Sequence, residues 1–112
     1  MKTIIAGAAL AALFVATPAL AAPIEGKWTT GNGTAAVIKK CGGSFCITLA
    51  SGDFKGKRIG RLSGSGNDYR GKITDPQTDK TYSGFAKLSG NSMRMRGCIV
   101  RPLCRSETWK RR

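Results

Sequence analysis

The chain of 112 residues carries 19 lysines and arginines against six aspartates and glutamates, and it contains no histidine. Its formal net charge of +13 favours anionic partners, although basic residues also fill the solvated faces of ordinary strands. Without histidine the commonest general base is missing, and no G-x-S-x-G, S-x-x-K or phosphate-binding glycine motif is present. We therefore expect no enzyme and no cofactor.

The first 21 residues have the pattern of a secretory signal peptide. Lys2 precedes an apolar run over residues 4–15, and Ala19 and Ala21 form an A-x-A cleavage site. The run is too short to span a bilayer, which takes about 20 residues. We expect a signal peptide over residues 1–21 and one domain over residues 22–112. That domain is expected to be periplasmic or secreted, with no transmembrane segment after cleavage.

The four cysteines form two close pairs. Cys41 and Cys46 flank four residues, and Cys98 and Cys104 flank five, spacings that suit the two sides of a hairpin. In a short exported chain such cysteines predict disulfides rather than a metal site. Local pairing is the favoured connectivity among the three, and each bridge should contribute about 2 kcal/mol.

Short stretches of alternating apolar residues recur along the mature chain, and glycine, asparagine or aspartate ends most of them. The first ends at Gly31-Asn32-Gly33, which is typical of a tight hairpin turn. An irregular segment over residues 51–57 is expected to be a loop. The expected strands cover residues 24–30, 34–41, 45–50, 58–63, 69–74, 81–88, 93–98 and 104–110.

This pattern predicts an all-β fold, because no helical apolar stripe interrupts it. Eight short strands joined by tight turns favour a small antiparallel up-and-down barrel, whose closure removes exposed sheet edges. A barrel of this size is filled by its own side chains or holds one small ligand, and filling is the favoured reading. The residues expected to line the interior are Trp28, Phe45, Ile47, Tyr69, Tyr82 and Met95.

Several motifs resemble those of a known family. Gly26-Lys27-Trp28 is similar to the first-strand signature of lipocalin-like and streptavidin-like barrels. Together with Cys41-Gly42-Gly43, Met95-Arg96-Gly97-Cys98 and Arg105-Ser106-Glu107-Thr108-Trp109, it resembles the exported bacterial proteins grouped as domain of unknown function 2147. The resemblance implies a lipocalin-like barrel without an established activity.

In lipocalin-like barrels an arginine of the last strand covers the first-strand tryptophan. The resemblance therefore implies that Arg105 or Arg111 lies over Trp28, and that Trp109 helps to close the barrel. We treat this contact as structural. The acidic residues lie mostly at expected turns, and Glu107, which stands between Arg105 and Trp109, is expected to pair with a neighbouring arginine. Neither a catalytic site nor a metal site is expected.

The basic residues predict a binding surface outside the barrel, with an anionic envelope polymer or lipid as partner. Specific nucleic-acid binding is disfavoured, because aromatic residues do not interleave with the charges. Two alternatives are a carrier of a small apolar ligand and an inhibitor that presents the bridged loop over residues 99–103 to another protein. The residues of the expected anionic-partner surface are Lys55, Lys57, Arg58, Arg61, Arg94, Arg96 and Arg101.

Overall fold

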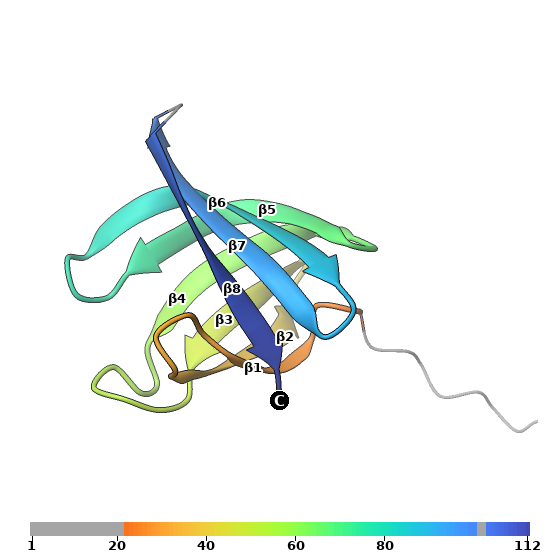
Figure 1. The fold of residues 1–112 in the computed structure, drawn as a ribbon, viewed down its shortest axis with the longest axis horizontal. Helices are drawn as coiled ribbons and strands as arrows, with labels where there is room; N and C mark the ends of the chain where they lie inside the picture. Colours follow the sequence, from red (N-terminus) through yellow and green to blue (C-terminus); the bar gives the residue numbers. More distant parts are fainter. Residues whose placement is uncertain (1–21, 101–102) are drawn as a thin grey trace, which may run out of the picture.

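The computed structural model describes residues 22–100 and 103–112, and they fold into a closed barrel (Figure 1). Each strand pairs antiparallel with the next, and β8 pairs with β1. This confirms the predicted eight-stranded barrel. The strands are β1 (Gly26–Thr29), β2 (Ala35–Cys41), β3 (Ser44–Leu49), β4 (Arg58–Ser65), β5 (Asp68–Asp75), β6 (Lys80–Ser89), β7 (Ser92–Val100) and β8 (Leu103–Arg111).

The predicted signal peptide lies outside the described residues, as does Arg101. Among the residues that are described, no helix is long and apolar enough to cross a membrane. The strand ends fall within two residues of their predicted positions, and residues 51–57 form the predicted loop.

The alternation of side chains decides which face of each strand is buried. On β6, Gly84, Ala86 and Leu88 are buried, whereas Lys87 is exposed. β1 is shorter than predicted because residues 23–24 form a turn, in which the Glu25 N–H donates a hydrogen bond to the Ala22 carbonyl at 2.9 Å. Ile24 therefore lies before the strand and is fully buried.

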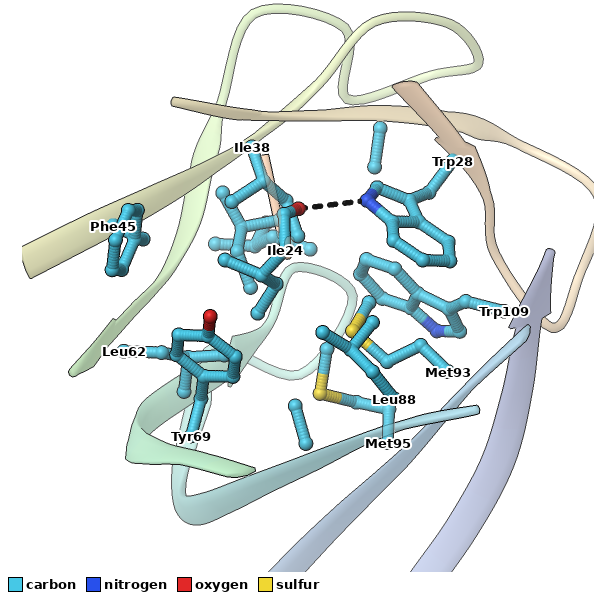
Figure 2. Packing of buried hydrophobic residues seen from close by; sticks show 14 of the residues in the cluster. Ile24, Trp28, Ile38, Phe45, Leu62, Tyr69, Leu88, Met93, Met95 and Trp109 are labelled. Atoms are coloured by element: carbon cyan, nitrogen blue, oxygen red, sulfur yellow. Dashed lines mark hydrogen bonds between the residues drawn. The ribbon is translucent and has the colours of Figure 1, made fainter. Parts of the chain in front are cut away.

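One apolar cluster fills the barrel around this N-terminal segment (Figure 2). The Trp28 indole donates a hydrogen bond to the Ile24 carbonyl at 3.0 Å, and the rings of Phe45 and Tyr69 meet edge to face at 5.6 Å. Each fully buried large side chain contributes about 1.5–3 kcal/mol. Five of the six residues expected to line the interior pack in this cluster, as the favoured filled interior requires: Trp28, Phe45, Ile47, Tyr69 and Met95.

The Tyr69 hydroxyl is one of two buried side-chain polar atoms among the described residues that this packing leaves unpaired, and the Trp109 indole nitrogen is the other. The hydroxyl is buried and has no hydrogen-bond partner among the described residues. Burial raises the pKa of Tyr69 above its usual value of 10, because an apolar environment disfavours the phenolate. The nearby Ile24 backbone partly opposes this shift, although its geometry falls short of a hydrogen bond.

The barrel closes where Trp28 of β1 stands opposite Arg111 of β8. The Arg111 guanidinium lies 4.2 Å from the centroid of the Trp28 ring. It also donates hydrogen bonds to the carbonyls of Glu25 at 3.1 Å and Pro23 at 2.6 Å. Arg111, and not Arg105, therefore covers the tryptophan and ties the last strand to the segment before the first. Trp109 is buried in the same cluster as Trp28.

Both predicted disulfides are present, and no cysteine is free among the described residues. The Cys41–Cys46 bridge closes the turn between β2 and β3, and the Cys98–Cys104 bridge joins β7 to β8 near the end of their hairpin. That hairpin projects beyond the neighbouring strands (Figure 1).

Candidate functional site

The outer surface of four consecutive strands carries a dense set of basic side chains. Cross-strand register brings them together: Arg61 stands opposite Lys72, Lys87 stands opposite Arg94, and Phe85 lies between the two remaining arginines. All six basic side chains belong to exposed residues. We call this set the basic face, and it consists of Arg61, Arg70, Lys72, Lys87, Arg94 and Arg96.

Few negative charges offset the basic face. Asp68 stands opposite Lys87 and pairs with it at 3.7 Å, but both side chains are about three-quarters exposed, so water screens the pair. Six cations against this one carboxylate leave a formal excess of five positive charges. Like charges directly opposite one another destabilise a sheet, as in the pairs Arg61–Lys72 and Lys87–Arg94. An arrangement of this kind favours an anionic partner.

Neutral contacts hold two of these arginines in place. Arg61 donates to the carbonyl of Cys41 at 3.3 Å. Arg96 lies 6.0 Å from the centroid of the Phe85 ring and donates to Cys104 Sγ at 3.5 Å. Neither contact neutralises the guanidinium charge. The arginines are thus oriented while their charge stays available to a ligand.

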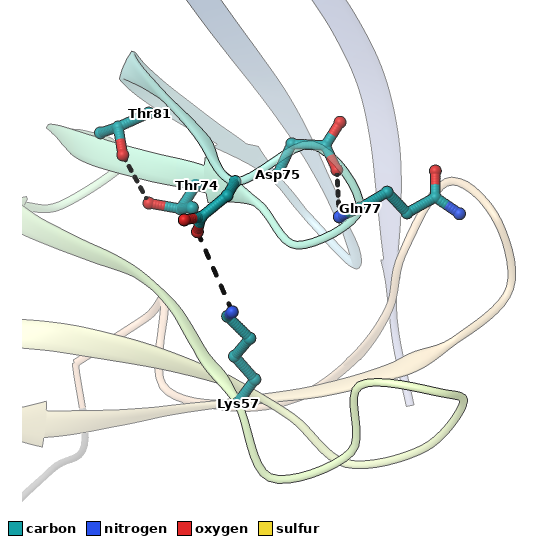
Figure 3. Close-up of polar contacts among 6 residues, drawn as sticks. Lys57, Thr74, Asp75, Gln77 and Thr81 are labelled. Atoms are coloured by element: carbon teal, nitrogen blue, oxygen red, sulfur yellow. Dashed lines mark hydrogen bonds and ion pairs between the residues drawn. The ribbon is translucent and has the colours of Figure 1, made fainter.

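The residues of the predicted anionic-partner surface lie in two separate parts of the structure. Arg61, Arg94 and Arg96 lie on the basic face, whereas Lys55 and Lys57 belong to the loop between β3 and β4. Lys57 forms a weak ion pair with Asp79 at 4.0 Å (Figure 3).

Arg58 begins β4 beyond that loop, opposite Thr48 of β3. Arg70, Lys72 and Lys87 were not predicted as part of the surface. The sequence does contain a signal that would have identified them. On β5 they alternate with Tyr69, Gly71 and Ile73, and on β6 with Ala86 and Leu88.

Two large apolar side chains are exposed at the end of the β7–β8 hairpin. Ile99 is 61% exposed and Leu103 is 64% exposed. The disulfide between Cys98 and Cys104 lies immediately behind them, beside the Arg96 guanidinium. We call Ile99 and Leu103 the hairpin tip, and it combines an apolar end with a positive charge at its base.

A cavity of about 690 Å³ lies at one end of the barrel. The connections β1–β2, β3–β4 and β5–β6 surround it, and inward-facing residues of β6, β7 and β8 complete its wall. We call it the end cavity. Two of the residues expected to line the interior, Tyr82 and Met95, also line this cavity, although Met95 is buried in the core cluster. Its charged lining residues are Asp53, Asp75, Arg105 and Glu107.

Glycines allow the close approaches that shape the end cavity. A Cβ atom at Gly97 would lie 3.2 Å from the Tyr82 ring, so the bare backbone of β7 lets that ring rest against it. At Gly31 a side chain would collide with the Glu107 carboxylate. Glu107 stands opposite Met95 in the sheet and lines the cavity. The predicted ion pair between Glu107 and an arginine is therefore absent among the described residues, because this side chain packs on Gly31 instead.

Turn contacts fix another wall of the end cavity (Figure 3). The Asp75 carboxylate accepts a hydrogen bond from the Gln77 backbone N–H at 2.8 Å, and the hydroxyls of Thr74 and Thr81 lie 2.9 Å apart. By contrast, the carboxylates of Asp53 and Glu107 have no hydrogen-bond or ion-pair partner among the described residues.

Comparison with known proteins identifies a family. The model of a family described as uncharacterized protein conserved in bacteria (domain of unknown function 2147) matches residues 55–111. No curated protein and no solved structure matches the chain. The matched segment runs from the β3–β4 loop through β8, so it contains all of the basic face and the hairpin tip.

Proposed function

We propose that this chain, which belongs to the bacterial family known as domain of unknown function 2147, binds an anionic lipid surface of the bacterial envelope. One observation carries the proposal: cross-strand pairing gathers six exposed cations on β4–β7 with a single carboxylate among them. Clustered basic residues attract anionic lipid by about 1 kcal/mol for each residue near the surface.

The hairpin tip favours lipid over a water-soluble polymer as the partner. A polyanion would be bound by charge alone, whereas a lipid surface also accepts apolar side chains. Ile99 and Leu103 are both more than half exposed, and the disulfide behind them joins the two strands of the hairpin. Arg96 lies at the base of this tip, where it would meet phosphate head groups.

The cysteines support a location where such lipids are accessible. Both pairs form disulfides, which persist in oxidising compartments such as the periplasm. Together with membership of a bacterial family of small proteins, this is consistent with export. We propose the periplasm or the extracellular space as the place of action, and binding without catalysis as the activity.

Two other functions have less support. A carrier of an apolar ligand would need space among Trp28, Phe45 and Ile47, which pack against one another. An inhibitor would use the hairpin tip against a protein partner, but that reading leaves the basic face without a role. Lipid binding makes use of both surfaces.

Vesicle co-sedimentation tests the proposal. The mature chain is mixed with vesicles of equal parts phosphatidylglycerol and phosphatidylcholine, or of phosphatidylcholine alone, at low and high salt. We expect binding to the anionic vesicles that weakens steeply with salt. Changing Arg70→Gln together with Arg96→Gln should weaken it about 30-fold, because two cations are lost.

Two comparisons make this result specific. The matched control is Lys39→Gln with Lys40→Gln, which removes the same charge from exposed residues of β2 and should have a smaller effect. Ile99→Ser with Leu103→Ser should weaken vesicle binding but leave binding to soluble polyphosphate unchanged. Equal binding to both kinds of vesicle would refute the proposal, and equal loss in the β2 control would refute the assignment to the basic face.

A further inference from the structure

The end cavity has a charge opposite to that of the whole molecule. The chain has six carboxylates in total, and three of them, Asp53, Asp75 and Glu107, line this one cavity. Arg105 is its single basic lining residue, which leaves a formal excess of two negative charges. In a protein with a net charge of +13, random placement of charged side chains would give such a cavity an excess of positive charge.

Two of these carboxylates are not used by the fold. Asp75 accepts a turn hydrogen bond, but Asp53 and Glu107 have no partner within the described residues. Many basic side chains are available elsewhere on the barrel, yet none of the described ones reaches Glu107, which rests on Gly31. Carboxylates held at a concave surface without counter-ions favour a cationic ligand.

A second, independent feature of the lining calls for a hydrogen-bond acceptor. Trp109 lines the end cavity and is 2% exposed, and its indole N–H has no acceptor among the described residues. The other indole, that of Trp28, is satisfied by the Ile24 carbonyl. The nitrogen itself is buried beneath the lining, so a ligand oxygen reaches it only when neighbouring side chains move aside. Because a buried donor without an acceptor is costly and uncommon, that contact would favour binding.

Aromatic and apolar side chains complete the lining. Phe54 of the β3–β4 loop, Tyr82 of β6 and Trp109 of β8 all border the cavity. Its volume of about 690 Å³ lies within the range of small-molecule sites. These rings supply contact surface for an apolar body, and aromatic faces also attract cations.

We infer that the end cavity binds a small organic amine that carries an aromatic or aliphatic body and a carbonyl or hydroxyl oxygen. The amine lies among Asp53, Asp75 and Glu107, the oxygen accepts from the Trp109 indole, and the body contacts the aromatic lining. This site is separate from the basic face and does not depend on lipid binding.

A matched series of probes tests the inference by calorimetry. The probes are N-(4-aminobutyl)benzamide, its 4-hydroxybutyl analogue and 4-benzamidobutanoate, which share a benzamide and differ in the charge at the far end. We expect the amine to bind most tightly, the alcohol more weakly and the carboxylate not at all. Equal binding of the three probes, or no binding of the amine, would overturn the proposal.

Paired variants locate the amine. Asp53→Asn with Glu107→Gln should weaken binding of the amine about tenfold and leave binding of the alcohol unchanged. The control is Asp68→Asn with Asp79→Asn, which makes the same change in charge at exposed residues outside the lining and should have no effect. An equal loss in the control would show that net charge, and not the cavity, attracts the amine.

Nuclear magnetic resonance tests the contact with Trp109. The protein has two indole N–H signals, which Trp109→Phe assigns. Saturation with the amine should move the Trp109 signal and leave the Trp28 signal in place. If the Trp109 signal stays fixed while the amine binds, the indole does not contact the ligand oxygen and the proposed orientation is wrong. Unchanged thermal unfolding of each aspartate and glutamate variant shows that a lost affinity is not lost folding.

Discussion

Arg111 shows how one side chain can hold a barrel closed. Its guanidinium covers the Trp28 ring at 4.2 Å and donates to two backbone carbonyls of the segment that precedes β1. Arginine can make these contacts together because its planar fork presents several donors in fixed directions. A lysine has the charge but cannot reproduce the geometry.

We predict that Arg111→Lys lowers the free energy of unfolding by about 2 kcal/mol, because two backbone carbonyls lose their donor. The measurement is urea unfolding followed by tryptophan fluorescence. Arg105→Lys is the matched control, since this arginine lies on the same strand but lines the end cavity. Its effect should stay below about 0.5 kcal/mol. Equal losses in the two variants would contradict the role given to Arg111.

At the scale of single strands, alternation was enough to predict most of the fold. Apolar and polar residues alternate along β5 and β7, for example, and turn residues separate the strands, so the positions and number of strands could be predicted from the sequence. It left open which face of β6 is buried, because Tyr82, Gly84 and Ala86 alternate there with Phe85. Packing decided this: Phe85 lies on the outer face beside Arg96.

Contacts between strands give Gly71 of β5 a role that its own strand does not reveal. A Cβ atom here would collide with the backbone of β4 at Arg61 and Leu62. A backbone obstacle cannot rotate away as a side chain can. Gly71 therefore allows β4 and β5 to approach closely at this point of the barrel.

We predict that Gly71→Ala destabilises the protein by about 2–3 kcal/mol, because the barrel must shift to admit the methyl group. Urea unfolding provides the measurement. Gly43→Ala is the control, since no atom lies within 4 Å of a Cβ at Gly43, and it should change stability by less than about 0.5 kcal/mol. If the two variants unfold at the same urea concentration, close packing is not the reason for glycine at position 71.

The whole molecule combines a small core with two covalent bridges. Its buried cluster is limited to one barrel interior, and domains of this size have total stabilities of about 5–15 kcal/mol. Two disulfides of about 2 kcal/mol each are therefore a large share of the total. The bridges join different pairs of strands, so their effects should be independent.

We predict that reduction of both bridges lowers the free energy of unfolding by about 4 kcal/mol. The variants Cys41→Ser with Cys46→Ser, and Cys98→Ser with Cys104→Ser, should each lose about half of this amount, and the losses should add. Chemical unfolding with and without reductant measures the effect. An unfolding midpoint that does not move on full reduction would show that the bridges contribute nothing to stability.

The distribution of charge also belongs to the whole molecule. Composition predicted a basic protein, but it could not show where the charges lie. The cations of the basic face share the outer surface of β4–β7, whereas three of the six carboxylates line the end cavity. Asp53 lies in the β3–β4 loop, Asp75 at the end of β5 and Glu107 in β8, so the three are distant in sequence. Only closure of the barrel brings them together.

The sequence by itself determined the strands, the closed barrel and the two disulfides, because each follows from local alternation, turn residues or short cysteine spacing. The tertiary structure decided which arginine covers Trp28, which basic side chains form one surface, and where the interior is packed or open. These depend on register between strands and on the convergence of loops, which no local pattern specifies.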